Sequence, residues 1–365
     1  MAAPPLRWGI LAPGWIAGQF AAALRRGTRQ QIAAVGSRDV HRARAFADAY
    51  GAPTAYGSYD ELVHDPQVDI VYVASPHSEH HRQARLALEA GKPVLVEKAF
   101  TRNAAEARDL IDLARANGLF VLEAGKPALV EKAFTRNAAE ARDLVALARS
   151  NGLFLLEGMW SRFLPHYDVI HQAVHVGLIG EVTTVFADHG QHLYPDGPDR
   201  LASPDLAGGA LLDLAVYPIS FADFVLGPLT TVTATGSLTD HGVDQQESIA
   251  VANAAGALGV LHASMLAASP CTATICGTDG RLEIAGTFYL PSSVTLRDRD
   301  GQFIDRYDPT GDTAHQGLRY EAAEAARCLT AGAAESPLHP PATTLRIMQA
   351  MDEVRRQLGV HFPGE

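Results

Sequence analysis

The sequence predicts an α/β fold with two parts. The first is an N-terminal Rossmann-type, doubly wound parallel sheet, and the second is a C-terminal α+β domain with a large, mainly antiparallel open sheet. Over the first hundred residues, short apolar runs alternate with amphipathic stretches, which is typical of βαβ units. After Glu157 the runs become β-rich and are separated by turns that contain glycine. A chain of 365 residues exceeds one ordinary core, so we expect two domains.

The first domain is predicted to span residues 1–157 and to bind the nucleotide. Its run Ile70–Ser75 is continuously apolar, as in a parallel strand that is buried on both faces. We expect strands at Trp8–Ala12, Gln31–Gly36, Ile70–Ser75 and Val94–Glu97, and helices at Ile16–Arg26, Val40–Tyr50 and His81–Ala90.

The second domain, residues 158–365, is predicted to bind substrate and to mediate oligomerisation. We expect helices at His166–Val176, Gly317–Ala331 and Pro341–Leu358, and strands at Val182–Ala187, Thr230–Gly236, Ser248–Asn253, Gly259–Ser264, Thr272–Cys276 and Arg281–Ile284. Two readings remain for the C-terminal helix, which either stays with this domain or packs back on the first.

A tandem repeat interrupts the first domain. Residues 90–123 return as residues 124–157 with five differences, Val94/Ala128, Ile111/Val145, Asp112/Ala146, Ala116/Ser150 and Val121/Leu155. A solenoid would show at least three diverged repeats, so we interpret the pair as a duplication within a finished fold. Because such a fold has room for one strand here, we expect one copy in the sheet and the other bulging out.

Composition and charge exclude several classes of function. A net charge of −11 argues against nucleic-acid binding, which needs a basic face. We identify no apolar run near the twenty residues of a membrane helix, and the N-terminus lacks the pattern of a signal peptide. Three cysteines without metal-like spacing favour a reducing compartment. These observations predict a cytoplasmic protein.

The first strand-to-helix turn resembles a dinucleotide fingerprint. Ala12, Gly14 and Ala17 occupy the three positions of G-x-G-x-x-G/A, so the tight turn is made without its first glycine. Gly14 allows the pyrophosphate close to the backbone, and the helix N-terminus at Trp15 and Ile16 supplies an anion-binding dipole.

The end of the second strand indicates which nucleotide binds. An NAD enzyme holds the adenosine ribose there with a carboxylate, whereas this chain has Ser37 and Arg38. A hydroxyl and a guanidinium bind a 2′-phosphate that a carboxylate would repel. The rival residue, Asp39, is better placed to cap the helix that starts at Val40. The sequence therefore favours NADP over NAD.

The ends of the next two strands complete the predicted cofactor site. Ligands of doubly wound sheets bind at the carboxyl edge, so we assign to the cofactor the residues Ser75, Pro76, His77, His80 and Glu97. His77, His80 and His81 have no further ligand cluster, so no metal site is predicted and they are interpreted as histidines of a helix surface.

Several segments together resemble the glucose–fructose oxidoreductase/inositol dehydrogenase/rhizopine-catabolism (Gfo/Idh/MocA) family. The similar subgroup contains dimeric dihydrodiol dehydrogenases and NADP-dependent D-xylose 1-dehydrogenases. The resemblance covers essentially the whole chain except one copy of the repeat. The matching segments are Trp8–Ala17, Ser75–His80, Glu97-Lys98, Glu157–Pro165 and Gly208–Pro218.

The resemblance implies a catalytic set of a lysine, Asp213 and Tyr217. A free tyrosine has a pKa of about 10, and a neighbouring ammonium group lowers it. Tyr217 is therefore expected to accept the proton, the lysine to orient and stabilise charge, and Asp213 to anchor the substrate. The lysine is Lys98 or Lys132, and Val94 against Ala128 slightly favours Lys98 by β-propensity.

The predicted substrate is a carbohydrate or a cyclic diol, with D-xylose-like aldoses as the first choice. Trp160, Arg162 and Arg200 are candidates for the pocket, although Trp160 and Arg162 equally suit the packing of the domain junction. Reduction of an anhydro-keto sugar, and a nucleotide-sensing regulator without catalysis, are the alternatives. The large sheet offers a face for a homodimer or a higher homo-oligomer.

Overall fold

The computed structural model describes residues 5–75, 77–92, 94–96, 109–110, 128–150, 152–309, 311, 314–363 and 365. The chain divides into two compact units. Unit 1 comprises 1–135, 139–160 and 315–341, and unit 2 comprises 136–138, 161–314 and 342–365. The segment 315–341 thus belongs to the first unit, although the sequence-based boundary at residue 157 assigned it to the second domain.

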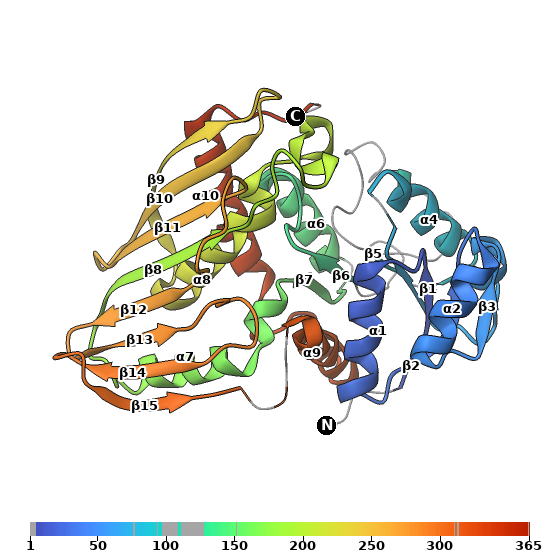
Figure 1. Cartoon of the computed structure of the whole chain (residues 1–365), viewed down its shortest axis with the longest axis horizontal. Coiled ribbons are helices and arrows are strands. Elements are labelled where there is room, and N and C mark those ends of the chain that lie inside the picture. The colour runs from blue at the N-terminus through green and yellow to red at the C-terminus, as the bar shows by residue number, and fades with distance from the viewer. Residues whose placement is uncertain are drawn as a thin grey trace. The chain divides into compact units, whose positions relative to one another are not determined.

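Unit 1 contains the predicted parallel sheet (Figure 1). Its order, β3-β2-β1-β4-β5-β6-β7, is that of a doubly wound fold with one strand more than the usual six. All the pairings are parallel. The strands are β1 (Arg7–Leu11), β2 (Gln31–Gly36), β3 (Thr54–Tyr56), β4 (Ile70–Val73), β5 (Val94–Val96), β6 (Ala128–Glu131) and β7 (Leu155–Gly158).

Helices cover this sheet on two sides. One apolar core holds Ile10, Phe20 and Val35 and is closed by α1 (Trp15–Gly27) and α2 (Val40–Tyr50). The other holds Leu11, Val73 and Val96 and is closed by α3 (Tyr59–Val63) and α4 (His77–Glu89). The helix α9 (Leu318–Thr330) packs on α1, and α6 (Ala138–Ser150) precedes β7. The apolar runs are therefore buried on both faces, as the sequence predicted.

Both copies of the repeat contribute to unit 1, which contradicts the expectation of one strand. β5 comes from the first copy and β6 from the second, and they pair with each other at Val96 and Val130. Leu110 of the first copy is fully buried in the core beside α4, and Asp109 binds Arg85 and His81. The repeat spans a whole βα unit, so a second unit fits a parallel sheet without reversing any strand. The expectation that only one copy supplies a strand of the sheet is therefore wrong.

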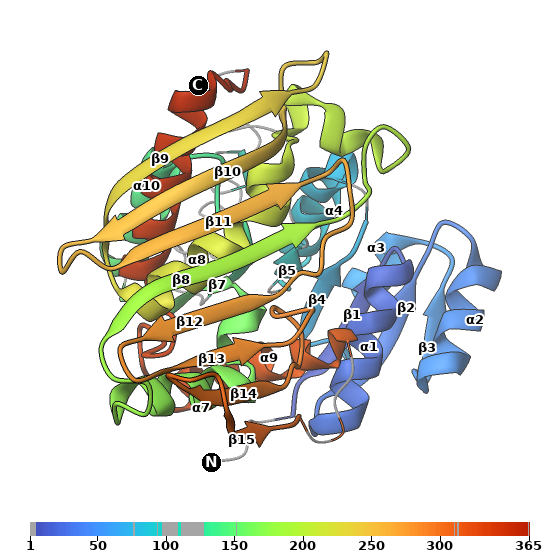
Figure 2. The same ribbon diagram turned by 60° about the vertical axis from the view of Figure 1, so that its left-hand side comes forward.

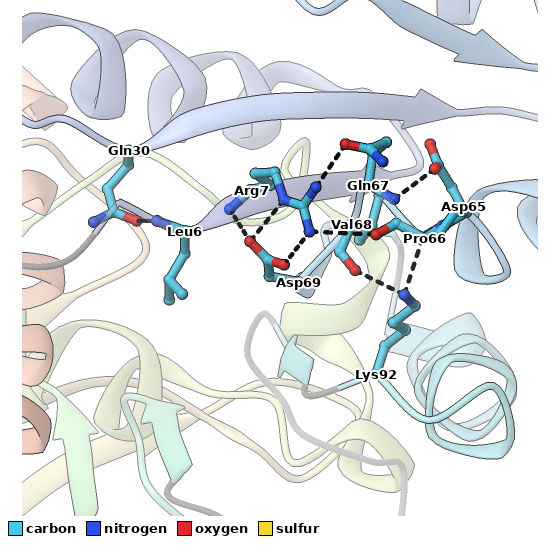
Figure 3. Close-up of polar contacts among 9 residues, drawn as sticks. All are labelled: Leu6, Arg7, Gln30, Asp65, Pro66, Gln67, Val68, Asp69 and Lys92. Atoms are coloured by element: carbon cyan, nitrogen blue, oxygen red, sulfur yellow. Dashed lines mark hydrogen bonds and ion pairs between the residues drawn. The ribbon is translucent and has the colours of Figure 1, made fainter.

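Polar contacts fasten the loop before β4 to its neighbours (Figure 3). The Arg7 guanidinium lies 2.7 Å from Asp69 and donates to Gln67. Lys92 donates to the backbone carbonyl oxygens of Asp65 and Val68, at 2.9 and 2.7 Å. Since Lys92 belongs to the first copy, the approach to β5 is tied to the strand that precedes it in the sheet.

Unit 2 contains an eight-stranded sheet of order β15-β14-β13-β12-β8-β11-β10-β9 (Figure 2). The β8–β11 pair is parallel and the other pairs are antiparallel. The strands are β8 (Val182–Gly190), β9 (Leu229–Leu238), β10 (Asp244–Asn253), β11 (Leu258–Ser264), β12 (Ala273–Gly277), β13 (Gly280–Ile284), β14 (Val294–Asp298) and β15 (Phe303–Tyr307).

Helices lie on one face of this sheet. They are α7 (Pro165–His175), α8 (Val216–Leu226) and α10 (Pro341–Leu358). In the described part of the chain, Phe186, Leu258 and Val260 remain exposed on the opposite face. The helical segment Pro204–Leu226 is long and apolar enough to cross a membrane, which the sequence analysis did not recognise, but 89% of its apolar window is buried inside the protein. It is a core segment of this unit.

Candidate active site

The first turn leaves its backbone accessible. Ala12 adopts φ 58°, a left-handed conformation that costs an alanine about 1 kcal/mol, and its amide donates to Gly36. Gly14 is the N-cap of α1, with Ile16 in the first helical turn. A Cβ at Gly14 would meet only the Ala12 oxygen, at 3.9 Å, and its φ of −122° suits any residue. Contacts within the protein therefore do not require this glycine, which fits a backbone approached by a phosphate.

The end of β2 presents the predicted hydroxyl and guanidinium. Ser37 is buried and its Oγ accepts from the Asp39 amide at 3.3 Å, while Arg38 is exposed. Asp39 caps α2 by accepting from the His41 amide, which confirms the capping role expected from the sequence. The sequence analysis missed Arg42, whose Nε donates to the Pro13 carbonyl oxygen at 3.1 Å. A second guanidinium thus borders the first turn.

The end of β4 supplies a buried polar atom. The Ser75 hydroxyl is buried and has no hydrogen-bond partner among the residues that the structure describes. His80 is fully buried, and its Nε2 donates to the Ser75 carbonyl oxygen at 2.7 Å, so it is not the surface histidine that the sequence analysis expected. A hydroxyl left unpaired at the carboxyl edge of the sheet suits a polar ligand.

Pro76, Glu97, Lys98 and the His77 side chain lie outside the described residues. Lys132 is described: it follows Glu131 at the end of β6 and is only 3% exposed.

Three rings in unit 1 connect the first turn with the segment after β7. Trp15 is exposed and meets His315 edge to face, with ring centroids 5.1 Å apart. Trp160 is buried, and its ring stacks on the His315 ring with centroids 5.7 Å apart. Burial lowers the pKa of His315, so the ring is neutral near pH 7. No sequence motif marks His315, and the analysis missed it.

The two predicted catalytic residues of unit 2 lie where one helical segment changes pitch. Asp213 belongs to a π-helical turn, Leu211–Ala215, in which the Val216 amide reaches back to the Leu211 carbonyl oxygen. Tyr217 follows in the first turn of α8 and is 7% exposed. Such π turns are frequent at functional sites because they redirect side chains.

A buried carboxylate holds the start of this segment. The Oδ2 atom of Asp244 accepts from the Leu211 amide at 2.6 Å. A Cβ at Gly209 would collide with the same carboxylate, and φ there is +116°, so both the space and the backbone require glycine. Burial raises the pKa of Asp244 to about 6, and burial next to Asp244 raises the pKa of Glu247 well above its usual value.

Asp213 and Tyr217 face polar and aromatic partners. Arg200 lies 3.2 Å from the Asp213 carboxylate, so these two predicted residues are brought together. The ring of Tyr289 stacks on Tyr217 with centroids 4.7 Å apart, and His189 lies 4.1 Å from Tyr289. Burial, and to a smaller extent the Asp213 carboxylate, raises the pKa of Tyr289, so the ion pair lies near these rings. We call Asp213, Tyr217, Tyr289, His189 and Arg200 together the unit 2 wall.

A series of hydrogen bonds fixes the orientation of His189 and Tyr289 in the unit 2 wall. His189 Nδ1 donates to the Leu214 carbonyl oxygen at 3.1 Å, and its Nε2 accepts from the Gln191 amide at 2.8 Å. The same amide group donates to the Tyr289 hydroxyl at 3.2 Å. His189 and Gln191 lie just beyond the strand predicted at Val182–Ala187, at the end of the observed β8, and the sequence analysis missed both; nothing in the sequence marks Tyr289.

Arg162 packs within unit 2. Its guanidinium lies 4.5 Å from the centre of the Phe224 ring and donates to the Ser220 carbonyl oxygen. These contacts lie inside unit 2, and the substrate-binding role of Arg162 stays a prediction. In the described part of the chain, no three histidine, cysteine or carboxylate side chains gather in a way that could hold a metal ion.

Comparisons with known proteins identify the two halves of the chain. Residues 6–122 match the oxidoreductase family model with an NAD-binding Rossmann fold, and residues 167–283 match the GFO/IDH/MocA C-terminal domain. Trans-1,2-dihydrobenzene-1,2-diol dehydrogenase from Xenopus laevis is 33% identical over 363 residues, which cover 98% of this chain and 99% of that protein. The protein of the same name from Mus musculus is 32% identical over 364 residues, covering 98% of each.

Two solved structures share the fold of this chain. A 3-ketoreductase from Actinomadura kijaniata in complex with NADP and TDP-benzene has a TM-score of 0.69 at 25% identity, covering 97% of this chain and 98% of that one. An aldose-aldose oxidoreductase from Caulobacter crescentus, complexed with glycerol, shares the fold with a TM-score of 0.71 at 22% identity, covering 98% of each. The chain belongs to the Gfo/Idh/MocA oxidoreductase family and is an NAD(P)-binding oxidoreductase that acts on CH–OH groups.

Proposed function

We propose that the protein is an NADP(H)-dependent dehydrogenase or reductase that acts on a hydroxyl or carbonyl carbon of a sugar or cyclic diol. The two substrate types are a trans-dihydrodiol and a D-xylose-like aldose. The observation that carries the proposal is the unit 2 wall, where the Asp213 carboxylate lies close enough to the stacked rings of Tyr217 and Tyr289 to affect the Tyr289 hydroxyl. A ring with adjacent hydroxyls suits it, because hydroxyls donate to the carboxylate and the ring face packs on the aromatic rings.

The nucleotide-binding residues suit NADP. Gly14 leaves the backbone open to the pyrophosphate, and the buried Ser75 hydroxyl offers a polar contact at the sheet edge. Ser37 and Arg38 provide donors for a 2′-phosphate. Bound NADP supplies the hydride acceptor, and NADPH supplies the donor in the reverse direction.

The residues of this chain divide the remaining work. Asp213, held by Arg200, accepts hydrogen bonds from the substrate hydroxyls and fixes their orientation. Tyr217 takes the proton of the reacting hydroxyl, and a lysine stabilises the charge that develops on the oxygen. Within unit 1, Trp15 and Trp160 both contact the His315 ring, so aromatic side chains border the nucleotide-binding turn.

The lysine is Lys98 or Lys132, and the sheet order favours Lys98. It follows β5, the direct neighbour of β4, and the proposed cofactor-binding residue Ser75 lies just beyond the end of β4. Lys132 follows β6, which lies one strand further from the nucleotide-binding turn. The burial of Lys132 supports the rival assignment. Burying an ammonium group costs free energy unless it is paired, and such buried charges often serve a functional site.

A homodimer formed through the open sheet face of unit 2 is the proposed assembly. Phe186 on β8 and Val260 on β11 are paired in register, and both are about half exposed. Thr233, Thr235, Ser248 and Ala250 continue the same shallow surface, which also includes Asp188 and His262. A second copy is the fitting occupant because a two-fold axis brings the same patch of each copy together, so that its apolar side chains bury one another. The reducing, cytoplasmic location expected from the three cysteines completes the proposal.

Reduced-nicotinamide absorbance with a panel of trans-diols and aldoses tests the function. We expect turnover with NADP on at least one of these classes, and weaker turnover with NAD. Activity confined to the reduction of an anhydro-keto sugar would replace the substrate class. Tight NADPH binding without turnover on any of these compounds would refute the enzyme and favour a nucleotide-sensing regulator. Light scattering of Phe186→Glu against the unmodified chain tests the dimer.

A further inference from the structure

The strands of unit 1 are aligned in one row near their carboxyl ends. Strand pairing places six residues side by side, in the order Gly36, Leu11, Val73, Val96, Val130 and Glu157. Val96 and Val130 are the same residue of the two copies, because the repeat is offset by 34 positions. The row therefore contains the repeated strand twice in succession, as β5 and β6 (Figure 1).

A single copy of the strand would pair with both β4 and β7, whereas here each copy pairs with only one of them. β5 pairs with β4 from Val94 to Val96, but with β6 only at Val96. β6 pairs with β7 along its whole length, from Ala128 to Glu131. Lys92 further ties the first copy to the loop before β4. Neither repeated strand has both β4 and β7 beside it.

The extra strand increases the distance between β4 and β7 by one strand spacing. Neighbouring strands lie about 4.8 Å apart, so one strand between β4 and β7 separates them by roughly 10 Å and two strands by roughly 14 Å. Catalytic groups tolerate far less, since a misplacement of about 1 Å can reduce a rate on the order of 100-fold. Whichever lysine acts, β7 and Trp160 after it therefore lie one strand spacing further from the nucleotide-binding ends of β1 and β4 than in a single-copy sheet, and so does Lys132.

We propose that the second copy of the βα unit is a wedge that separates the nucleotide-binding strands from β7, and that the chain with one copy is the more active enzyme. The inference rests on the proposed function, because it assumes that a lysine at this strand end acts beside the cofactor. It concerns only the order of strands within unit 1.

A deletion of residues 98–131 tests the effect on activity. It joins Glu97 directly to Lys132 and leaves one complete copy between β4 and β7. We expect kcat/KM to rise by a factor on the order of 100, with unchanged NADPH affinity because β1, β2 and β4 are intact. A deletion variant that binds NADPH and is no more active than an active full-length chain overturns the inference.

A distance measurement tests the wedge without any turnover. Spin labels at Gln67→Cys and Ser150→Cys occupy exposed positions before β4 and before β7, with Cys276→Ser in every chain to remove a half-buried thiol. We expect the deletion to shorten this distance by about 5 Å, one strand spacing. An unchanged distance overturns the wedge even if activity changes.

A control pair separates this effect from a general distortion. Labels at Gln67→Cys and Arg44→Cys lie on the same side of the repeat, and their distance should be equal in both chains. Absence of turnover in both chains refutes the proposed function, whereas the label distance still decides on the wedge.

Discussion

Arg200 and Asp213 form an ion pair in unit 2, with the guanidinium Nη2 3.2 Å from the carboxylate Oδ1. The Asp213 side chain is 11% exposed and that of Arg200 29%. Asp213 lies on the π-helical turn Leu211–Ala215, whereas Arg200 comes from the separate 3-10 helix Asp199–Ala202. The carboxylate is therefore oriented by a second segment of the chain. We therefore expect Arg200 to act as a positioning residue through Asp213.

Arg200→Ala should lower kcat/KM for the diol or aldose by about 10- to 100-fold, since a hydrogen bond to a charged group contributes about 1.5–3 kcal/mol. Steady-state kinetics with the active substrate provide the measurement, and NADPH affinity should not change. Arg200→Lys keeps the charge and should recover part of the loss. Equal kinetics for the alanine variant and the unmodified chain would remove Arg200 from the site.

Tyr217→Phe should abolish turnover, with a loss of about 10²- to 10⁴-fold in kcat, because it removes the proposed proton acceptor and keeps the ring stack. Tyr289→Phe is the matched control. It removes the hydroxyl that receives the Gln191 bond but keeps the stack on Tyr217, so only a mild loss is expected. If the two variants lose activity equally, Tyr217 acts through packing and not as the proton acceptor.

Much of the fold could be predicted from the sequence because its signals are local. Asp39 before Val40 marks a cap, and the apolar run from Ile70 marks a buried strand, as observed. The second copy of the repeat was misjudged because the number of strands in a sheet depends on pairing between distant segments. Val96 and Val130 are adjacent only once the chain has folded.

The candidate site divides in the same way. Asp213 and Tyr217 were identified from a resemblance and Arg200 as a weaker candidate, and the structure joins Arg200 to Asp213. Tyr289 and His315 escaped detection, because a lone aromatic ring has no spacing that distinguishes a site from a core. Only its partners, Tyr217 and Trp160, indicate a role.

Arg38→Ala should reduce the preference for NADP over NAD by about tenfold or more, since the guanidinium is expected to bind the 2′-phosphate. The ratio of kcat/KM for the two cofactors is the measurement. Arg42→Ala is the comparison, because its Nε is engaged by the Pro13 carbonyl oxygen. It should weaken both cofactors by disturbing the first turn. An unchanged ratio in Arg38→Ala would contradict the assignment of the 2′-phosphate.

The buried pair of Asp244 and Glu247 predicts how stability depends on pH. Burial and the neighbouring Asp244 raise the pKa of Glu247, and burial raises that of Asp244 to about 6, against backbone donors and Arg355, which lower it. Between the ordinary carboxyl range and these raised values, the folded chain binds more protons than the unfolded chain. The free energy of unfolding therefore falls as pH rises from about 4 through 6 and above.

Glu247→Gln should flatten this dependence, because the amide replaces a protonated carboxyl and cannot ionise. Urea unfolding between pH 5 and pH 8 should show little change at pH 5 and a gain of roughly 1–3 kcal/mol at pH 8. Glu353→Gln is the control. The Arg356 side chain holds the pKa of exposed Glu353 at about 2, so any stability that it contributes is lost only at acid pH. For Glu353→Gln, the change in the free energy of unfolding between pH 5 and pH 8 should match that of the unmodified chain. If Glu247→Gln shows an equally steep change, Glu247 is not the group that titrates.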